Sequence, residues 1–335
     1  MMDALLEGRG AAPARIGLLA RLASPRLTLV ALALLAGGVL AAYRSEAHSD
    51  WLLVAPLALC AVNLACAVLT NAVFRRQTAL LVFHLALIAI VLLAAAGRLT
   101  YLKGRVELST GEAFTGELSE VTRGPWHPWR LDRVAFANRG FDIHYNPRLK
   151  RDRTRNTVSW ADESGPREAV IGDTDPLVLR GYRFYTSPNK GFAPLFTWVP
   201  LRGAPSRGTV HLPSYPMHEY RQAQEWTPPG ADAPLWIMLQ FDEVLIDPER
   251  PSEFRLPSRH TLVVRAGTER AALAPGARIA LPQGTLVYEG LTTWMGYAVF
   301  FDPTLPWLLA ACLLAAASLA WHFWRKFAAE PWSEA

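Results

Sequence analysis

The chain has 335 residues, of which 51% are hydrophobic and only 19% charged, a balance unusual for a soluble globular protein. Its 12 Trp, 25 Pro and 23 Gly exclude a coiled coil or an all-helical bundle, and its 3 Cys, without paired spacing, exclude a disulfide scaffold, a zinc module and covalent c-type haem attachment. The net charge of +5 comes without a lysine-rich tail, so the sequence predicts no nucleic-acid binding. A membrane protein explains this composition better.

Four stretches are long and apolar enough to cross a bilayer, whose hydrocarbon core of roughly 30 Å needs about 20 helical residues. They cover residues 27–43, 51–74, 78–102 and 305–324. The first could be a secretory signal segment, but two more apolar stretches follow at once. We therefore interpret it as an uncleaved membrane anchor.

Short flanking segments rich in Arg and Lys are retained on the cytoplasmic side of a membrane. Arginines precede the first span, Arg75 and Arg76 join the second to the third, and Arg325 and Lys326 follow the fourth. Basic residues at the outer end of the third span favour the opposite orientation. We expect a cytoplasmic N-terminus over residues 1–26 and a three-helix membrane domain over 27–102. We further expect an extracytoplasmic domain over 103–302, a last membrane helix over 303–324 and a cytoplasmic tail over 325–335.

The segment between the third and fourth spans is long enough to bury a core of its own. It holds β-branched and aromatic runs bounded by turn residues, which predict strands at residues 141–145, 157–160, 177–185, 235–241, 260–264 and 284–289. We expect a β-rich sandwich or open barrel, with Pro-rich connections 200–216 and 226–234 on its surface. All three cysteines, Cys60, Cys66 and Cys312, lie in predicted spans, so this domain folds without disulfides.

His84 is the most informative residue, because hydrocarbon side chains surround it in the third span. Its side-chain neighbours three and four positions away offer no hydrogen bond, so we expect a partner on another helix or a ligand. The structural alternative is a hydrogen bond to Asn63 of the preceding antiparallel span. The functional alternative is a haem ligand, since neutral imidazole is the commonest one. Both remain open from position alone.

The other candidate residues have simpler interpretations. His322, amid tryptophans near the end of the fourth span, is a weaker candidate ligand, because an interfacial aromatic belt explains it. Asp173 and Asp175 could be paired carboxylates, but Asp before Pro is typical of a turn. The basic run 148–155 indicates a hairpin tip, or secondly a contact with anionic lipid or an acidic partner. The sequence contains no motif for nucleophilic catalysis, and we predict no catalytic residue.

The order of these parts is also that of a known family. Residues 21–29 lead into the first span, Phe83-His84 with Gly97 mark the third, residues 181–188 and 191–194 form a "Gly-Tyr, then Gly-x-Ala-Pro" pair, and residues 294–303 lead into the last span. With three clustered N-terminal spans, a β-rich outer domain and one C-terminal span, the chain resembles the ResB-like (CcsB-type) cytochrome c biogenesis proteins of the system II pathway.

The resemblance implies a subunit of a cytochrome c synthetase complex in the bacterial cytoplasmic (inner) membrane, and not an enzyme acting alone. A ResC-like (CcsA-type) haem protein would be its partner, and together they would export haem, keep its iron reduced and attach it to apocytochrome c. The third-span histidine of the family, here His84, would be an axial ligand of a transient haem b shared with that partner. The alternative is a membrane-anchored β-domain interaction or assembly protein without haem, in which His84 is structural.

Overall fold

The structure is a computed structural model that describes residues 12–44 and 49–328. The chain forms two compact units. The helical unit contains Met1–Leu102, Arg123–Pro128 and Asp302–Ala335, and the sheet unit contains Lys103–Thr122 and Trp129–Phe301.

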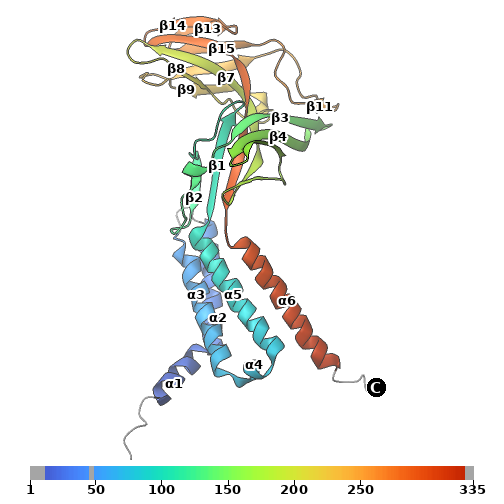
Figure 1. The fold of residues 1–335 in the computed structure, drawn as a ribbon. Helices are drawn as coiled ribbons and strands as arrows, with labels where there is room; N and C mark the ends of the chain where they lie inside the picture. Colours follow the sequence, from blue (N-terminus) through green and yellow to red (C-terminus); the bar gives the residue numbers. More distant parts are fainter. Residues whose placement is uncertain (1–11, 45–48, 329–335) are drawn as a thin grey trace, which may run out of the picture. The chain divides into compact units, whose positions relative to one another are not determined.

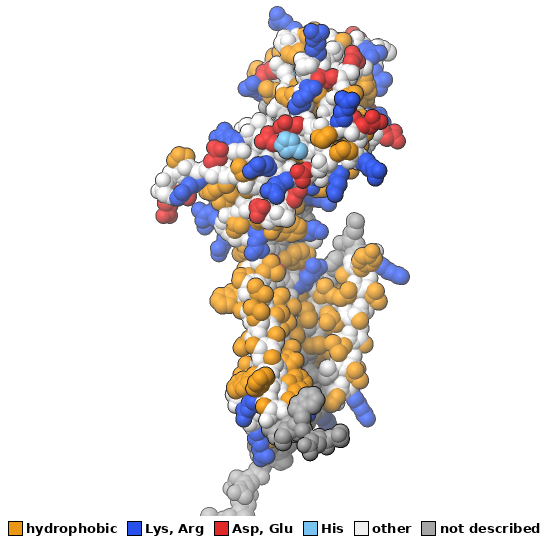
Figure 2. All heavy atoms as spheres, turned by 90° about the vertical axis from the view of Figure 1, so that its right-hand side faces the viewer, with side chains coloured by type: hydrophobic (Ala, Val, Ile, Leu, Met, Phe, Trp, Pro, Cys, Tyr) orange, Lys and Arg blue, Asp and Glu red, His pale blue; other side chains and the backbone are white. Residues whose placement is uncertain are grey.

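The helical unit contains the predicted membrane spans (Figure 1). Its helices are α1 (Ala12–Leu22), α2 (Pro25–Arg44), α3 (Trp51–Thr70), α4 (Ala72–Arg76), α5 (Thr78–Thr100) and α6 (Leu305–Ala328). Within the described ranges α2, α3, α5 and α6 are long and apolar enough to cross a membrane, which confirms the four predicted spans. Figure 2 shows hydrophobic side chains covering the visible face of these helices. The chain is therefore a membrane protein.

The second predicted span is interrupted before its expected end. α3 stops at Thr70, and the Asn71 side chain accepts a hydrogen bond from the Val73 N–H (3.0 Å) at the start of the short helix α4. α1 is a further difference, because residues 12–22 were expected only as part of a cytoplasmic N-terminus. Residues 1–11 and 329–335 of the two expected cytoplasmic ends lie outside the described residues.

Small residues let α5 and α6 pack closely. A Cβ at Gly97 would lie 2.7 Å from Thr304 Oγ1, immediately before α6 begins. The buried residues of α6 are Ala311, Ala315 and Ser318, all small and spaced along one face. Small residues at such spacing are typical of helix contacts in membranes, where close backbone approach replaces the hydrophobic effect.

The C-terminal end of α5 is capped by the segment Arg123–Pro128, which belongs to the helical unit. The N–H of Gly124 donates to the carbonyl of Tyr101 (3.0 Å). The N–H of Trp126 donates to the carbonyl of Leu99 (2.8 Å). These are helix-end carbonyls without partners in their own helix, so the segment satisfies groups that would otherwise need water.

The sheet unit contains three sheets, which confirms the β-rich domain (Figure 1). A seven-stranded sheet has the order β2-β1-β15-β7-β6, with β14 on β15 and β8 on β7; two four-stranded sheets have the orders β13-β12-β10-β9 and β11-β3-β4-β5. The strands are β1 (Leu102–Ser109), β2 (Glu120–Arg123), β3 (Ala137–Asn146), β4 (Lys150–Asp162), β5 (Gly165–Ile171), β6 (Leu177–Leu179), β7 (Tyr182–Pro200), β8 (Ser206–Thr209), β9 (Ala223–Trp226), β10 (Leu235–Gln240), β11 (Ser252–Glu253), β12 (Thr261–Ala266), β13 (Glu269–Leu273), β14 (Arg278–Leu281) and β15 (Gly284–Phe301).

Two long strands, β7 and β15, pair antiparallel along almost their whole length. The register shifts twice, between Tyr288 and Gly290 and between Met295 and Tyr297. Each bulge bends this long strand pair and increases its twist. The largest fully buried side chains of these strands include Trp198, Tyr182, Tyr288, Tyr297, Phe184, Phe192 and Phe196. This aromatic core is the centre of the sheet unit.

A buried polar network ties the seven-stranded sheet to the sheet of β3 and β4. The Tyr297 hydroxyl donates to Asn156 Oδ1 (2.8 Å), and Asn156 Nδ2 donates to Asn138 Oδ1 (2.8 Å). Asn138 Nδ2 in turn donates to the carbonyl of Leu108 on β1 (2.9 Å). Because all these groups are paired, the network specifies one arrangement of the two sheets at little desolvation cost.

Two local predictions were wrong. Residues 177–185 form a hairpin and not one strand, because Arg180 and Gly181 both adopt positive φ (52° and 88°), as a tight two-residue hairpin turn requires. The segment 200–216 is not a surface connection, since it contains β8 and buries Leu212 and Tyr215. Apolar side chains there join the core despite the prolines around them.

Candidate functional site

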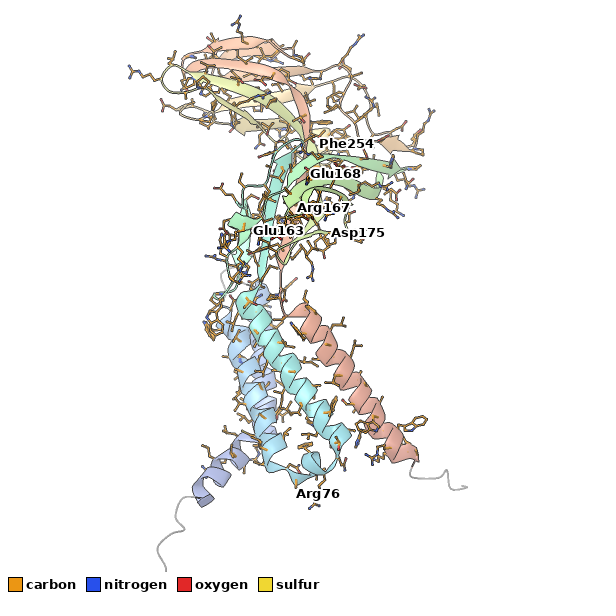
Figure 3. The ribbon with its side chains drawn as sticks, viewed as in Figure 1. Arg76, Glu163, Arg167, Glu168, Asp175 and Phe254 are labelled. Atoms are coloured by element: carbon orange, nitrogen blue, oxygen red, sulfur yellow. The ribbon has the colours of Figure 1, made fainter. Side chains whose placement is uncertain are left out.

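His84 lies in the second turn of α5, close to the corner where α4 meets this helix. Arg76 marks that corner in Figure 3. Because α4 turns back toward α5, its Phe74 ring packs on the imidazole with centroids 4.2 Å apart and planes tilted by 45°. The neighbouring Phe83 ring stands edge-on to it at 5.3 Å. The imidazole is half-buried and lies between two aromatic rings.

One nitrogen of this imidazole is fixed by the helix itself. His84 Nδ1 lies 2.7 Å from the backbone oxygen of Leu80, one turn earlier. A carbonyl oxygen only accepts, so the proton of the neutral ring is on Nδ1 and the lone pair is on Nε2. The described residues provide no hydrogen-bond partner for Nε2.

The expectation that His84 finds no partner on its own helix was therefore wrong. The side chains of the neighbouring residues offer no partner, but the main chain does. A carbonyl oxygen has two lone pairs, so the Leu80 oxygen can accept from the helical N–H four residues later and from the imidazole as well.

Asn63 does not bind His84, so the predicted structural partner was also wrong. Its Oδ1 accepts from Thr28 Oγ1 (2.6 Å), and its Nδ2 donates to the carbonyls of Leu22 (2.6 Å) and Ser24 (3.1 Å). These two carbonyls belong to the turn between α1 and α2. The buried amide thus anchors that turn against α3.

The donor set at His84 suits haem better than a multi-ligand metal site. Histidines that bind a metal through Nε2 usually donate Nδ1–H to a carbonyl or carboxylate, which orients the ring and raises its basicity. Within the described ranges no group of three or more His, Cys, Asp or Glu side chains could hold a metal ion. Haem iron needs only one or two axial side chains, because the porphyrin supplies four nitrogens.

His322 is not brought into this site. It lies near the end of α6, where its ring contacts Phe323 edge-on at 5.5 Å. Trp321 and Trp324 beside it are exposed, as expected of an aromatic belt at a membrane surface. Phe74 and Phe83 contact His84, whereas Phe323 contacts His322.

The remaining candidates have structural roles. Asp173 accepts from Arg151 Nη2 (2.8 Å) and from Thr186 Oγ1 (2.8 Å) in the turn before β6, so it is not paired with Asp175. The basic run 148–155 begins at the β3–β4 hairpin turn, where Arg148 has φ 65°. Cys60, Cys66 and Cys312 are free cysteines in α3 and α6.

The sequence did not reveal a serine, histidine and glutamate arranged in a row in the sheet unit. Ser109 Oγ lies 3.0 Å from His211 Nε2, and His211 Nδ1 lies 3.0 Å from Glu107 Oε2. The Trp294 ring stacks on the imidazole at 5.1 Å. Glu107 and Ser109 alternate along β1, but nothing local relates them to a histidine about a hundred positions later.

This cluster lacks the features of a nucleophilic site. Ser109 is only 4% exposed, and its hydroxyl also lies 2.6 Å from Thr209 Oγ1. Its N–H donates to Glu112 Oε2 (2.8 Å), and that of Thr110 donates to the carbonyl of Thr293 (2.8 Å), so neither can stabilise an oxyanion. The cluster instead joins β1 to the segment that follows β8.

A comparison with protein families finds a match in this chain. Residues 70–225 match the model of the ResB-like family, whereas a search of curated proteins finds no match. The matched segment begins at the end of α3, includes α5 with His84, and extends into β9. A ResB-like segment implies, in general terms, a role in cytochrome c biogenesis. The match over residues 70–225 therefore confirms the resemblance of this chain to the ResB-like, CcsB-type cytochrome c biogenesis proteins.

Proposed function

We propose that this chain is the haem-handling subunit of a complex that exports haem across the bacterial cytoplasmic membrane and presents it, reduced, to apocytochrome c. His84 Nε2 would hold the haem iron within the membrane. The observation that carries the proposal is the hydrogen bond from His84 Nδ1 to the Leu80 carbonyl, because it leaves Nε2 unprotonated and without a protein partner among the described residues.

The residues around His84 prepare it for this role. The Leu80 carbonyl selects the tautomer and limits rotation of the ring. Phe74 and Phe83 pack against the imidazole and help to hold its orientation. When bound, haem supplies the redox-active iron that the complex delivers.

Haem is held here without covalent attachment. Thioether linkage needs a pair of cysteines close to an axial histidine, and the sequence contains no C-x-x-C-H. Cys60, Cys66 and Cys312 lie singly within α3 and α6. A transient haem b shared with a ResC-like (CcsA-type) partner fits a single imidazole, because the partner would supply the other side chains that hold it.

The test is the haem content of the complex. His84→Ala, co-purified with a ResC-like partner, should contain less haem in a pyridine haemochrome assay, and added imidazole should restore most of it by entering the vacated position. His322→Ala is the matched control and should retain its haem. Full haem in His84→Ala, or loss confined to His322→Ala, would contradict the proposal.

A second candidate function is a membrane-anchored assembly protein that binds no haem. It is favoured by the same hydrogen bond seen differently, because an imidazole satisfied by its own helix can persist in a membrane without any ligand. In that case His84→Ala changes neither haem content nor cytochrome maturation. The experiment above thus separates the two functions.

A further inference from the structure

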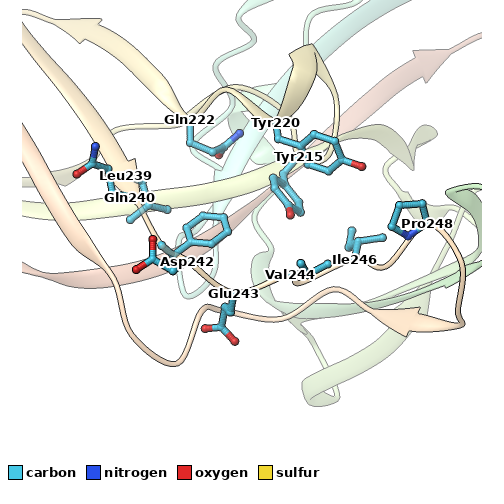
Figure 4. Close-up of a pocket in the computed structure, with 11 residues that line it drawn as sticks. Tyr215, Tyr220, Gln222, Leu239, Gln240, Asp242, Glu243, Val244, Ile246 and Pro248 are labelled. Carbon is cyan, nitrogen blue, oxygen red and sulfur yellow. The ribbon is translucent and has the colours of Figure 1, made fainter.

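The sheet unit contains a pocket that haem handling does not use. Its volume is about 710 Å³, within the usual range for ligand sites. Four stretches contribute to its wall: the segment with Tyr215 and Tyr220, the residue before β9, the end of β10, and residues 241–248 (Figure 4). All of them belong to the sheet unit.

The pocket contains a buried acceptor that has no donor. Gln222 is 4% exposed, and its Nε2 donates to the carbonyls of Pro213 (3.0 Å) and Arg221 (2.9 Å). These two bonds fix the amide, because a flipped amide would bring its oxygen against two other oxygens. Gln222 Oε1 is then buried without a hydrogen-bond partner among the described residues. A ligand with an N–H group would satisfy it.

The charge of the lining is negative. Its ionisable groups other than tyrosine are the carboxylates of Asp242 and Glu243, and it includes no lysine, arginine or histidine. Arg255 forms an ion pair with Glu243 (2.6 Å) and, together with Ser258, lowers its pKa to about 2, so this carboxylate stays ionised but its charge is already balanced. Asp242 is exposed and has no ion-pair partner in the described part of the chain.

Aromatic rings form much of the remaining wall. The Tyr215 ring stands edge-on to Tyr220 (5.6 Å) and to Phe241 (6.1 Å). Burial raises the pKa of Tyr215 to about 12, so its hydroxyl stays neutral. Flat rings beside carboxylates favour a planar cation that also carries several N–H donors.

We propose that this pocket binds the guanidinium side chain of an arginine presented by an extended polypeptide partner. The guanidinium satisfies Gln222 Oε1, stacks on the aromatic wall and pairs with Asp242. Lysine fits less well, because its ammonium is a strongly hydrated point charge without a flat face. The inference does not rest on haem binding by His84.

The position of the pocket explains why the partner is a polypeptide. Gln222 immediately precedes β9, which is the edge strand of its sheet. The Gln222 carbonyl accepts from the N–H of Leu239 (2.9 Å), so the pairing with β10 continues to the pocket. An extended segment can add to the open edge of β9 through its backbone while one side chain enters the pocket.

The test uses the full chain in detergent and the peptide acetyl-Gly-Arg-Gly-amide, with binding measured by calorimetry. The matched peptide carries citrulline, which has nearly the same shape as arginine and no charge. We expect the arginine peptide to bind best, the lysine peptide more weakly, and the citrulline and glutamate peptides weakest. Rising salt should weaken the binding of the arginine peptide, as for any partly exposed charge pair.

Two variants assign the binding to this pocket. Asp242→Asn should weaken the arginine peptide about fivefold, the effect of one partly exposed charge pair, whereas Asp232→Asn, an exposed aspartate outside the lining, should not. His84→Ala should bind the peptide normally, which separates this inference from the proposed function. Undetectable binding, equal binding of the citrulline peptide, or equal affinities of the two aspartate variants would overturn it.

Discussion

Lys190 is the most deeply buried charged side chain in the sheet unit. It lies on β7, is 3% exposed, and donates from Nζ to the carbonyl of Pro188 (3.2 Å) while lying over the Tyr145 ring at 5.4 Å. Burial lowers its pKa from 10.5 to about 8, and the Arg151 charge nearby acts in the same direction. The folded protein therefore tolerates the ammonium form less well than the unfolded chain does.

This pKa predicts how stability depends on pH. Between pH 8 and 10.5 the unfolded chain binds a proton at Lys190 that the folded chain has lost, so stability rises with pH. Below pH 8 the full penalty of the buried charge is present. Burial raises the pKa of Tyr145 and Tyr215 from 10 to about 12, so above pH 10 the same relation makes stability fall.

Thermal unfolding of the full chain, followed by tryptophan fluorescence, should show a rise between pH 8 and 10, on the order of 2 kcal/mol. Lys190→Met should remove that rise and be more stable than the parent at pH 7. The matched control is Lys150→Met, at an exposed lysine of β4. Parallel pH profiles for the parent and Lys190→Met would show that the lysine is not the titrating group.

Asn63 provides a second prediction at the scale of one residue. Replacing it with Leu removes hydrogen bonds to Thr28 and to the α1–α2 turn. Each bond contributes roughly 0.6 kcal/mol, so the free energy of unfolding of the helical unit should fall by about 1–2 kcal/mol. Haem content should not change. Thr70→Val is the control, because within the described residues the Thr70 hydroxyl donates only to the Cys66 carbonyl of its own helix. An Asn63 variant that loses haem while keeping its stability would tie Asn63 to the haem site.

Among the elements, the contact of the segment Arg123–Pro128 with the end of α5 leaves no room for an added side chain. A Cβ at Gly124 would lie 2.3 Å from the backbone oxygen of Leu99, and a backbone atom cannot move aside as a flexible side chain can. The Trp126 ring, which stands edge-on to Trp51 at 6.1 Å, depends on the same contact. A methyl group should therefore separate the segment from the helix.

Gly124→Ala should accelerate tryptic cleavage after Arg123 and change the fluorescence of Trp126. Gly208→Ala is the matched control, because a Cβ there meets nothing within 4 Å and the backbone needs no positive φ. If Gly124→Ala resists trypsin as well as the parent does, the segment does not depend on this close approach.

At the scale of the whole molecule, membrane orientation is the prediction with most consequences. Arg75 and Arg76, together with Arg325 and Lys326, predict that the α4–α5 corner and the end of α6 lie in the cytoplasm. Reporter fusions at Ser49 and Arg153 should read as extracytoplasmic, and a fusion at Trp332, which lies outside the described residues, as cytoplasmic. A cytoplasmic signal at Arg153, on β4, would reverse the orientation and remove the role proposed for the sheet unit.

The features that could be predicted from sequence depend on neighbours along the chain. The starts of α5 and α6, at Thr78 and Leu305, follow from the cost of placing polar groups in hydrocarbon, and that cost can be added up residue by residue. The sheet unit follows from runs of β-branched and aromatic residues. His84 stood out because an imidazole in an apolar helix is rare. The hairpin at Arg180 and Gly181 was missed because an apolar run hid its turn residues.

The tertiary structure decided what connects distant positions. In the tertiary structure Asn63 binds the α1–α2 turn and does not bind His84. The same is true of Ser109, His211 and Glu107, which meet only when the chain folds. The pocket beside Gln222 joins segments from different elements. Such contacts depend on strand register, helix rotation and close backbone approach. A one-residue change of register turns a strand's side chains to the opposite face, so the local sequence alone does not determine which distant groups meet.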